Sequence, residues 1–89
     1  MAHSVSARKR VRQNLRRRAL NRWRLRAMRA AIKDLHEQLL HGTNEEITTS
    51  FRAAGAVIDR AAQNRVIHRN QAARRKSRLN ARVKAKITG

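Results

Sequence analysis

Apolar residues in the first half of the chain recur at helical spacing, and the pattern changes near residue 25. From there, five apolar side chains follow one another at steps of three and four residues: Leu25, Met28, Ile32, Leu35 and Leu39. This is the spacing of a helix face that packs against a partner. No Gly or Pro interrupts residues 7–40, Ser4 and Ser6 are good N-caps, and His41-Gly42 is a typical helix end. The pattern predicts one helix of about 35 residues, about 52 Å long.

Upstream of residue 25, the same helix carries only a thin apolar line surrounded by basic residues. The members of this line are Val11, Leu15, Ala19 and Trp23. If the stripe of the second half is extended backward, it reaches Arg22 and Arg18 instead of apolar side chains. We therefore expect a single domain, residues 1–89, in which residues 1–24 project and residues 25–89 form the bundle.

Two further helices are predicted downstream. Thr43 followed three residues later by Glu46 is a capping box. The helix that it begins has its own apolar line: Ile47, Phe51, Ala54, Ile58 and Ala61. After a break, Asn70 is expected to cap a third helix over about residues 71–87. The apolar line of this third helix is Ala72, Leu79, Val83 and Ile87. The predicted fold is all-α, a three-helix bundle with a long N-terminal helix projecting beyond the bundle.

The charge of the chain indicates its kind of partner. Lys and Arg total 23 against 5 Asp and Glu, which gives a net charge of +18. Residues 1–33 and 60–89 contain no acid, and all five acids lie within residues 34–59. A small soluble domain normally carries both signs and a net charge of about 2–8. Because Lys and Arg bind phosphate backbones with release of condensed cations, we expect a nucleic acid partner.

Other function classes find little support in the sequence. A chain of 89 residues makes one small domain without room for a large catalytic cavity, and it has no Cys for a disulfide framework. No stretch of about 20 uncharged residues exists to span a membrane. Asp34, Glu37 and His41 share a helix face, which we interpret as solvated and carrying a Lys33–Glu37 pair. We expect no catalytic residue, no metal, no cofactor and no small-molecule substrate.

Residues 70–78 also resemble the basic region of leucine-zipper transcription factors. After Asn70, Ala73 and Arg78 fit that motif, but Arg74 stands where a small residue belongs. Only 11 residues follow Arg78, too few for a zipper of several heptads. A histone-like or zipper-like DNA-binding protein is therefore the alternative function. A cationic helix on a membrane surface is a weaker one, because the apolar line of the basic arm is too thin to bury.

Short motifs spread over nearly the whole chain carry a family resemblance. They are Ser6-Ala7-Arg8-Lys9-Arg10, Gln13-Asn14, Arg17-Arg18, Asn21, Ile32-Lys33, Ile58-Asp59-Arg60-Ala61-Ala62, Val66-Ile67-His68, Asn70 and Ala72-Ala73-Arg74-Arg75-Lys76-Ser77-Arg78-Leu79. With these motifs the chain resembles the bacterial small-subunit ribosomal protein family numbered twenty.

The chain departs from the family pattern at two places. Asn64-Arg65 stands where the family commonly has Lys-Gly, so the second helix either uses Asn64 in a left-handed conformation or ends differently. Trp23 and Arg26 stand where smaller or Ser-like residues are usual. A Trp at this position either stacks on a base or packs on the bundle.

The resemblance implies a cytoplasmic, structural component of the small ribosomal subunit that binds 16S ribosomal RNA directly and stabilises its folding and assembly. It implies contact with the 5′ domain and the 3′ minor domain of that RNA and with the rest of the subunit. We expect cations to clamp phosphates of separate RNA helices, neutral donors to reach sugars and bases, and His68 to contact a phosphate or cap a helix. The predicted contact residues are Arg8, Lys9, Arg10, Arg12, Gln13, Arg16, Arg17, Arg18, Asn21 and Arg24 in the first helix, and His68, Asn70, Arg74, Arg75, Lys76, Ser77 and Arg78 in the third.

Overall fold

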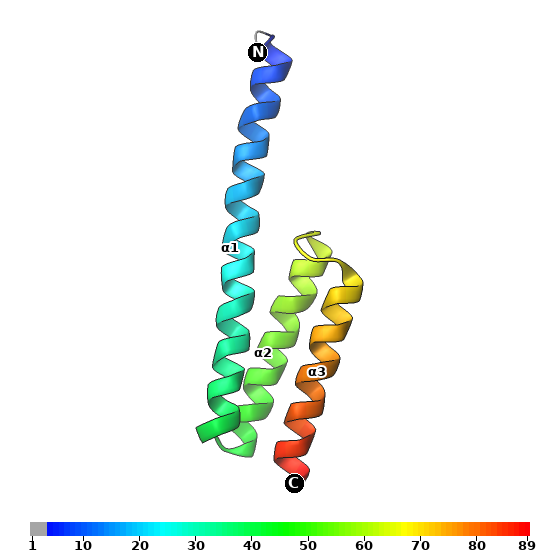
Figure 1. Ribbon diagram of the computed structural model, residues 1–89. Helices are drawn as coiled ribbons and strands as arrows, with labels where there is room; N and C mark the ends of the chain where they lie inside the picture. Colours follow the sequence, from blue (N-terminus) through cyan, green and yellow to red (C-terminus); the bar gives the residue numbers. More distant parts are fainter. Residues whose placement is uncertain (1–3) are drawn as a thin grey trace.

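A computed structural model describes residues 4–89, and within this range the chain forms three α-helices and no strand (Figure 1). Helix α1 spans Val5–His41, α2 spans Asn44–Gln63 and α3 spans Arg69–Thr88. Residues 1–3 of the predicted projecting segment lie outside the described range. The predicted all-α fold with a long first helix projecting beyond a bundle is confirmed.

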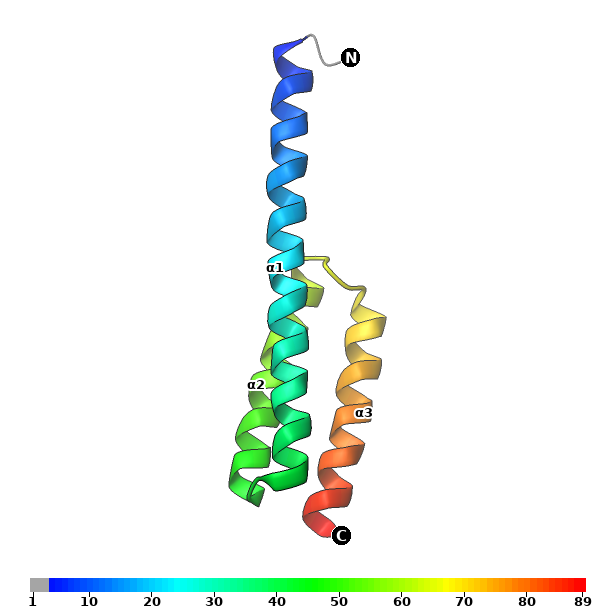
Figure 2. The same ribbon diagram turned by 60° about the vertical axis from the view of Figure 1, so that its left-hand side comes forward.

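The three helices run side by side in alternating directions, and α2 packs against both α1 and α3 (Figures 1 and 2). The N-terminal half of α1 extends beyond the end of the other two helices in both views. The molecule is 62 Å long but only 22 and 15 Å across. Its radius of gyration of 17.5 Å exceeds the roughly 12 Å of a compact domain of this length. The overhang of α1 explains this elongated shape.

The core is built from the predicted apolar lines of all three helices. Its buried members are Met28, Leu35, Ile47, Ala54, Ile58, Ala61, Ala72, Leu79 and Val83, together with Ile67 between α2 and α3. Leu25, Ile32, Leu39 and Phe51 are partly buried and pack against this cluster. Ile87 was predicted to join it but is 37% exposed. The prediction for Ile87 is wrong because this residue lies in the last turn of α3, where no further turn follows to help cover its side chain.

Both ends of α1 are formed by backbone and side-chain contacts. The Ser4 hydroxyl accepts a hydrogen bond from the Ala7 N–H at 3.1 Å, so Ser4 is the N-cap and Ser6 is not. At the other end, Gly42 has an extended conformation with φ −85°. A Cβ at this position would lie 2.8 Å from the Gln38 carbonyl oxygen. Glycine is needed at residue 42 for this close approach and not for a left-handed conformation.

The predicted N-cap of α2 is confirmed. The Thr43 hydroxyl oxygen accepts a hydrogen bond from the Glu46 N–H at 3.2 Å. The same hydroxyl lies 3.3 Å from Glu46 Oε1 and donates to it. Glu45 and Glu46 in the first turn also complement the positive end of the helix dipole. The chain therefore reverses direction within two residues after α1 and returns as α2.

The connection from α2 to α3 decides between the two alternatives that the sequence left open for the end of α2, and it differs from the predicted cap of α3. Of the two alternatives for the end of α2, the second holds: Asn64 has φ −87°, and Arg65, with φ 57°, adopts the left-handed conformation instead. The Arg65 N–H donates to the Ala62 carbonyl at 3.0 Å, and the Val66 N–H donates to the Ala61 carbonyl at 2.9 Å, which closes the end of α2. His68 is the N-cap of α3, and its Nδ1 accepts from the Asn70 N–H at 3.1 Å. Asn70 therefore lies in the first turn and is not the cap, whereas the capping alternative for His68 is confirmed.

The conformation of Arg65 leads to a stability prediction. The left-handed conformation costs a residue with a Cβ about 1–2 kcal/mol. Glycine adopts it without this steric cost but loses more conformational entropy on folding. We expect Arg65→Gly to raise the free energy of unfolding by about 0.5–1 kcal/mol, measured by urea denaturation. Arg52→Gly removes the same charge from an exposed position inside α2, and we expect it to lower the free energy of unfolding by about 1 kcal/mol. If both substitutions change the free energy of unfolding by the same amount, the left-handed conformation of Arg65 does not cost stability.

Candidate nucleic-acid interface

The overhanging half of α1 presents its cations to solvent. Every residue from Arg8 to Leu20 is exposed, and α1 has no buried residue before Met28. Since successive residues turn by about 100°, the seven cations of this stretch point to nearly all sides of the helix. They are Arg8, Lys9, Arg10, Arg12, Arg16, Arg17 and Arg18. Residues 5–33 include no acid that pairs with them, so this part of the helix is a free surface for anions.

A groove lies where α1 passes the end of α2, and we call it the overhang groove. Its walls are Gln13, Arg16, Arg17, Leu20, Asn21 and Arg24 of α1 and Asn64 and Arg65 after α2. Five predicted contact residues meet here: Gln13, Arg16, Arg17, Asn21 and Arg24. Asn64 and Arg65 were not predicted as contacts, although their departure from the family pattern was a signal. Four guanidinium groups and three amides line the groove, and no acid does, which suits phosphate and ribose oxygens.

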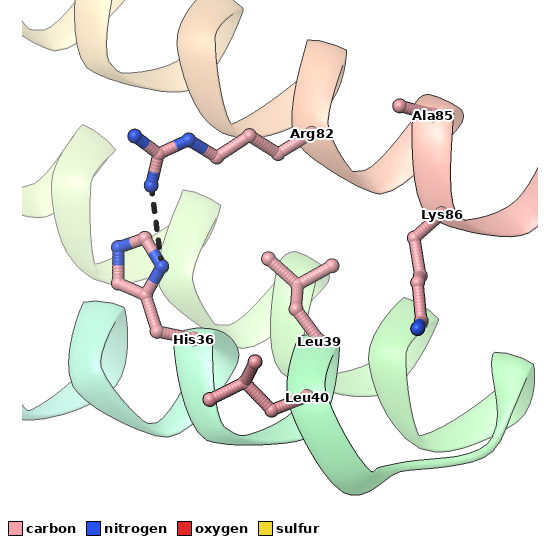
Figure 3. A pocket seen from close by; sticks show the side chains of 6 residues that line it. All are labelled: His36, Leu39, Leu40, Arg82, Ala85 and Lys86. Atoms are coloured by element: carbon pink, nitrogen blue, oxygen red, sulfur yellow. Dashed lines mark hydrogen bonds between the residues drawn. The ribbon is translucent and has the colours of Figure 1, made fainter.

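Two adjoining pockets that share His36 and Arg82 lie between α1 and α3, and we call them together the α1–α3 groove; Figure 3 shows one of them. Its lining residues are Ile32, His36, Leu39 and Leu40 of α1 and Arg75, Arg78, Leu79, Arg82, Ala85 and Lys86 of α3. Arg82 reaches across the groove and donates to His36 Nδ1 at 3.4 Å (Figure 3). Arg75 and Arg78 were predicted as contacts, whereas Arg82 and Lys86 were not among the predicted residues. The sequence signal for this cationic face is the spacing of Arg75, Arg78 and Arg82, which places three cations on one side of α3.

The remaining predicted residues of α3 lie at its exposed first half. His68, Asn70, Arg74 and Ser77 are exposed and line neither the overhang groove nor the α1–α3 groove. The Lys76 ammonium is 3.1 Å from the carboxylate of Asp59, and both side chains are about half exposed. An exposed pair of this kind contributes about 0–1 kcal/mol, so the Asp59 contact holds the Lys76 ammonium only weakly.

The acidic residues have a structural role that the sequence did not indicate. The hydroxyl of buried Ser50 on α2 donates to Asp34 Oδ2 at 2.9 Å and joins α2 to α1. The predicted Lys33–Glu37 pair is not formed, since Lys76–Asp59 is the one ion pair among residues 4–89. This part of the chain also contains no group of three or more His, Asp or Glu residues arranged to hold a metal ion. No helix within residues 4–89 has an apolar stretch long enough to cross a bilayer.

Comparison with known proteins gives consistent matches over almost the whole chain. The profile of the family described as Ribosomal protein S20 matches residues 2–84. The Small ribosomal subunit protein bS20 of Methylorubrum extorquens (strain PA1) is 45% identical over 85 residues, which cover 96% of this chain and 97% of that protein. The protein of the same name from Nitrosomonas eutropha is 40% identical over 85 residues, 96% of this chain and 98% of the relative. That from Shewanella loihica is 41% identical over 96% of this chain and 97% of its own length.

Proposed function

Because the chain belongs to the ribosomal protein S20 family, we propose that it binds 16S ribosomal RNA directly and joins separate RNA segments by clamping their phosphates. As a member of this family, it is a structural protein of the small ribosomal subunit in the cytoplasm and not an enzyme. In this proposal residues 1–24 are the projecting RNA-binding segment, and residues 25–89 are the bundle that carries it.

The observation that carries the proposal is the unpaired positive charge of the α1 overhang. Arg8 to Arg18 supply seven exposed cations without one acid, and the overhang groove adds Arg24 and Arg65 from two separate segments. A helix that is cationic on all sides is unstable alone, because like charges repel at spacings of three and four residues. RNA strands on more than one side of α1 would offset this repulsion. This arrangement favours RNA packed around the helix over a single flat contact.

The second arm of the clamp is α3. Arg75 and Arg78 line the α1–α3 groove, and Arg74 and Ser77 are exposed on the same helix. Because the overhang of α1 and the body of α3 lie at different ends of a 62 Å molecule, they reach RNA segments that are far apart. We assign these segments to the 5′ domain and the 3′ minor domain of 16S ribosomal RNA. In this proposal the protein stabilises RNA folding during assembly by holding the two together.

The proposal predicts a steep dependence of binding on salt. If about 8 phosphates are engaged, the slope of log K against log salt is expected near −6 to −7, at about 0.7–0.9 per contact. Filter binding of the full chain to deproteinised 16S ribosomal RNA between about 50 and 200 mM salt measures it. A slope near zero would refute phosphate clamping.

Competition experiments test the choice of nucleic acid. Unlabelled transcripts of the 5′ domain are expected to displace labelled 16S ribosomal RNA at fixed salt, and duplex DNA of equal phosphate number is expected to displace it far less. A transcript of the 3′ minor domain tests the second contact. Equal competition by duplex DNA would favour the alternative, a histone-like DNA-binding protein.

A further inference from the structure

Trp23 is the only tryptophan in the chain, and it remains outside the core. Its side chain is 66% exposed, although Leu25, two residues further along α1, packs against the buried cluster. The interpretation that Trp23 packs on the bundle is therefore wrong. Trp is highly buried on average and is enriched at interfaces, so an exposed Trp is a candidate contact residue.

The neighbours of Trp23 on α1 are cations. Positions 12, 16, 19, 23 and 26 follow one another at steps of four, three, four and three, so they share one face of the helix. This face carries Arg12, Arg16, Ala19, Trp23 and Arg26. Arg16 lies about 10 Å along the axis on one side of Trp23 and Arg26 about 4.5 Å on the other. Helical side chains lean toward the N-terminus, and on that side the neighbour of Trp23 is Ala19, which is too small to cover an indole ring.

An uncovered indole ring between guanidinium groups suits a ligand that is both planar and polyanionic. A nucleotide within an RNA strand has both properties, since its base stacks on an aromatic ring while the phosphates on either side bind Arg. Arg16 and Arg26 interrupt the apolar surface of this face, and their charge favours a polyanion over an apolar protein surface. A base inside a duplex is already stacked on both faces, so only an unpaired base can take part.

We propose that Trp23 is a base-stacking site for an unpaired nucleotide of ribosomal RNA. The inference rests on the proposed function and adds a contact that recognises bases to an interface of phosphate contacts. Phosphate contacts are the same in every sequence, whereas a stacking site selects RNA with a bulge, loop or strand end beside the cationic face. The site therefore fixes the position of α1 along the RNA.

The fluorescence of Trp23 provides a direct test, because the chain contains no other Trp and no Tyr. We expect deproteinised 16S ribosomal RNA to quench the emission of the full-length protein strongly and to protect it from acrylamide. We expect Trp23→Ala to raise the Kd for this RNA about tenfold, since loss of a stacking aromatic ring costs about fivefold to a hundredfold. Trp23→Phe, which keeps a ring, is expected to stay within about threefold of the parent.

Two controls separate this inference from the proposed function. Leu15→Ala removes an apolar side chain that is 60% exposed on the same overhang and is expected to leave the Kd unchanged. The salt slope of Trp23→Ala is expected to equal that of the parent, because its phosphate contacts remain. If the Trp23 emission does not change at RNA concentrations that saturate filter binding, base stacking is overturned while the proposed function stands. The same holds if Trp23→Ala binds RNA with the affinity of the parent.

A protein occupant would give a different result. If Trp23→Ala binds bare RNA like the parent but is washed from small subunits more readily than the parent, Trp23 contacts a neighbouring protein and base stacking is overturned. If the parent fails to bind 16S ribosomal RNA at all, the proposed function fails together with this inference.

Discussion

Deletion of residues 1–22 is expected to lower the affinity for 16S ribosomal RNA on the order of a thousandfold while the bundle remains folded. The deletion removes eight cations: Arg8, Lys9, Arg10, Arg12, Arg16, Arg17, Arg18 and Arg22. Each lost phosphate contact reduces the salt slope by about 0.7–0.9, so the slope is expected to fall by several units. The buried core begins at Met28 and loses no member. Filter binding measures the affinity, and far-ultraviolet circular dichroism and thermal unfolding report the fold.

Substitutions in the full-length chain provide the matched control for this deletion. Replacing Arg8, Arg12, Arg16 and Arg17 by Gln keeps the length of α1 and removes four exposed charges. We expect this variant to bind RNA more weakly and with a shallower salt slope than the parent. Its unfolding temperature is expected to be no lower than that of the parent, because repulsion between the cations of α1 is relieved. Arg52→Gln, an exposed cation on α2 outside both grooves, is expected to change the affinity little. If the deleted chain unfolds, or binds RNA as well as the parent does, the proposed division between residues 24 and 25 is wrong.

Leu35→Ala is expected to lower the free energy of unfolding by about 2–5 kcal/mol, the largest effect of a single substitution that we predict. Leu35 is fully buried in the cluster that joins the three helices, so its removal leaves a cavity. Domains of this size have only about 5–15 kcal/mol of stability, and a loss of this size removes a large part of it. Urea denaturation followed by circular dichroism is the measurement.

Leu40→Ala tests whether this effect comes from the core. Leu40 lies five residues further along the same helix, but its side chain is 73% exposed. The same chemical change there is expected to alter the free energy of unfolding by less than about 0.5 kcal/mol. Below its own unfolding transition, Leu35→Ala is expected to bind RNA with nearly the parent affinity, because Leu35 lies in neither groove. If the two substitutions lower the free energy of unfolding by similar amounts, the buried cluster around Leu35 is not the source of the stability of the fold.

The helices themselves were predictable because their signals are local. The stripe from Leu25 to Leu39 needs only the period of the helix to be recognised, and the Thr43 cap needs only the spacing to Glu46. The helix ends that lack a strong local sequence signal were predicted less well. His68 caps α3 in place of Asn70, and Arg65 takes the left-handed conformation in place of Asn64. Both depend on how the chain must turn to place α3 against α2, and spacing within one segment contains no information on that turn.

The sequence by itself determined that this protein is helical, that its charge is concentrated at both ends, and that the first helix divides into a cationic and an apolar half. These properties follow from composition and from the period of one helix, which are independent of the neighbours. Only the tertiary structure decided which cations meet. The end of α2 brings Arg65 to Arg16 and Arg24, and the packing of α3 brings Arg82 to His36. Contacts between segments far apart in the chain depend on how far the helices overlap, and that overlap is set by the packing of the whole core.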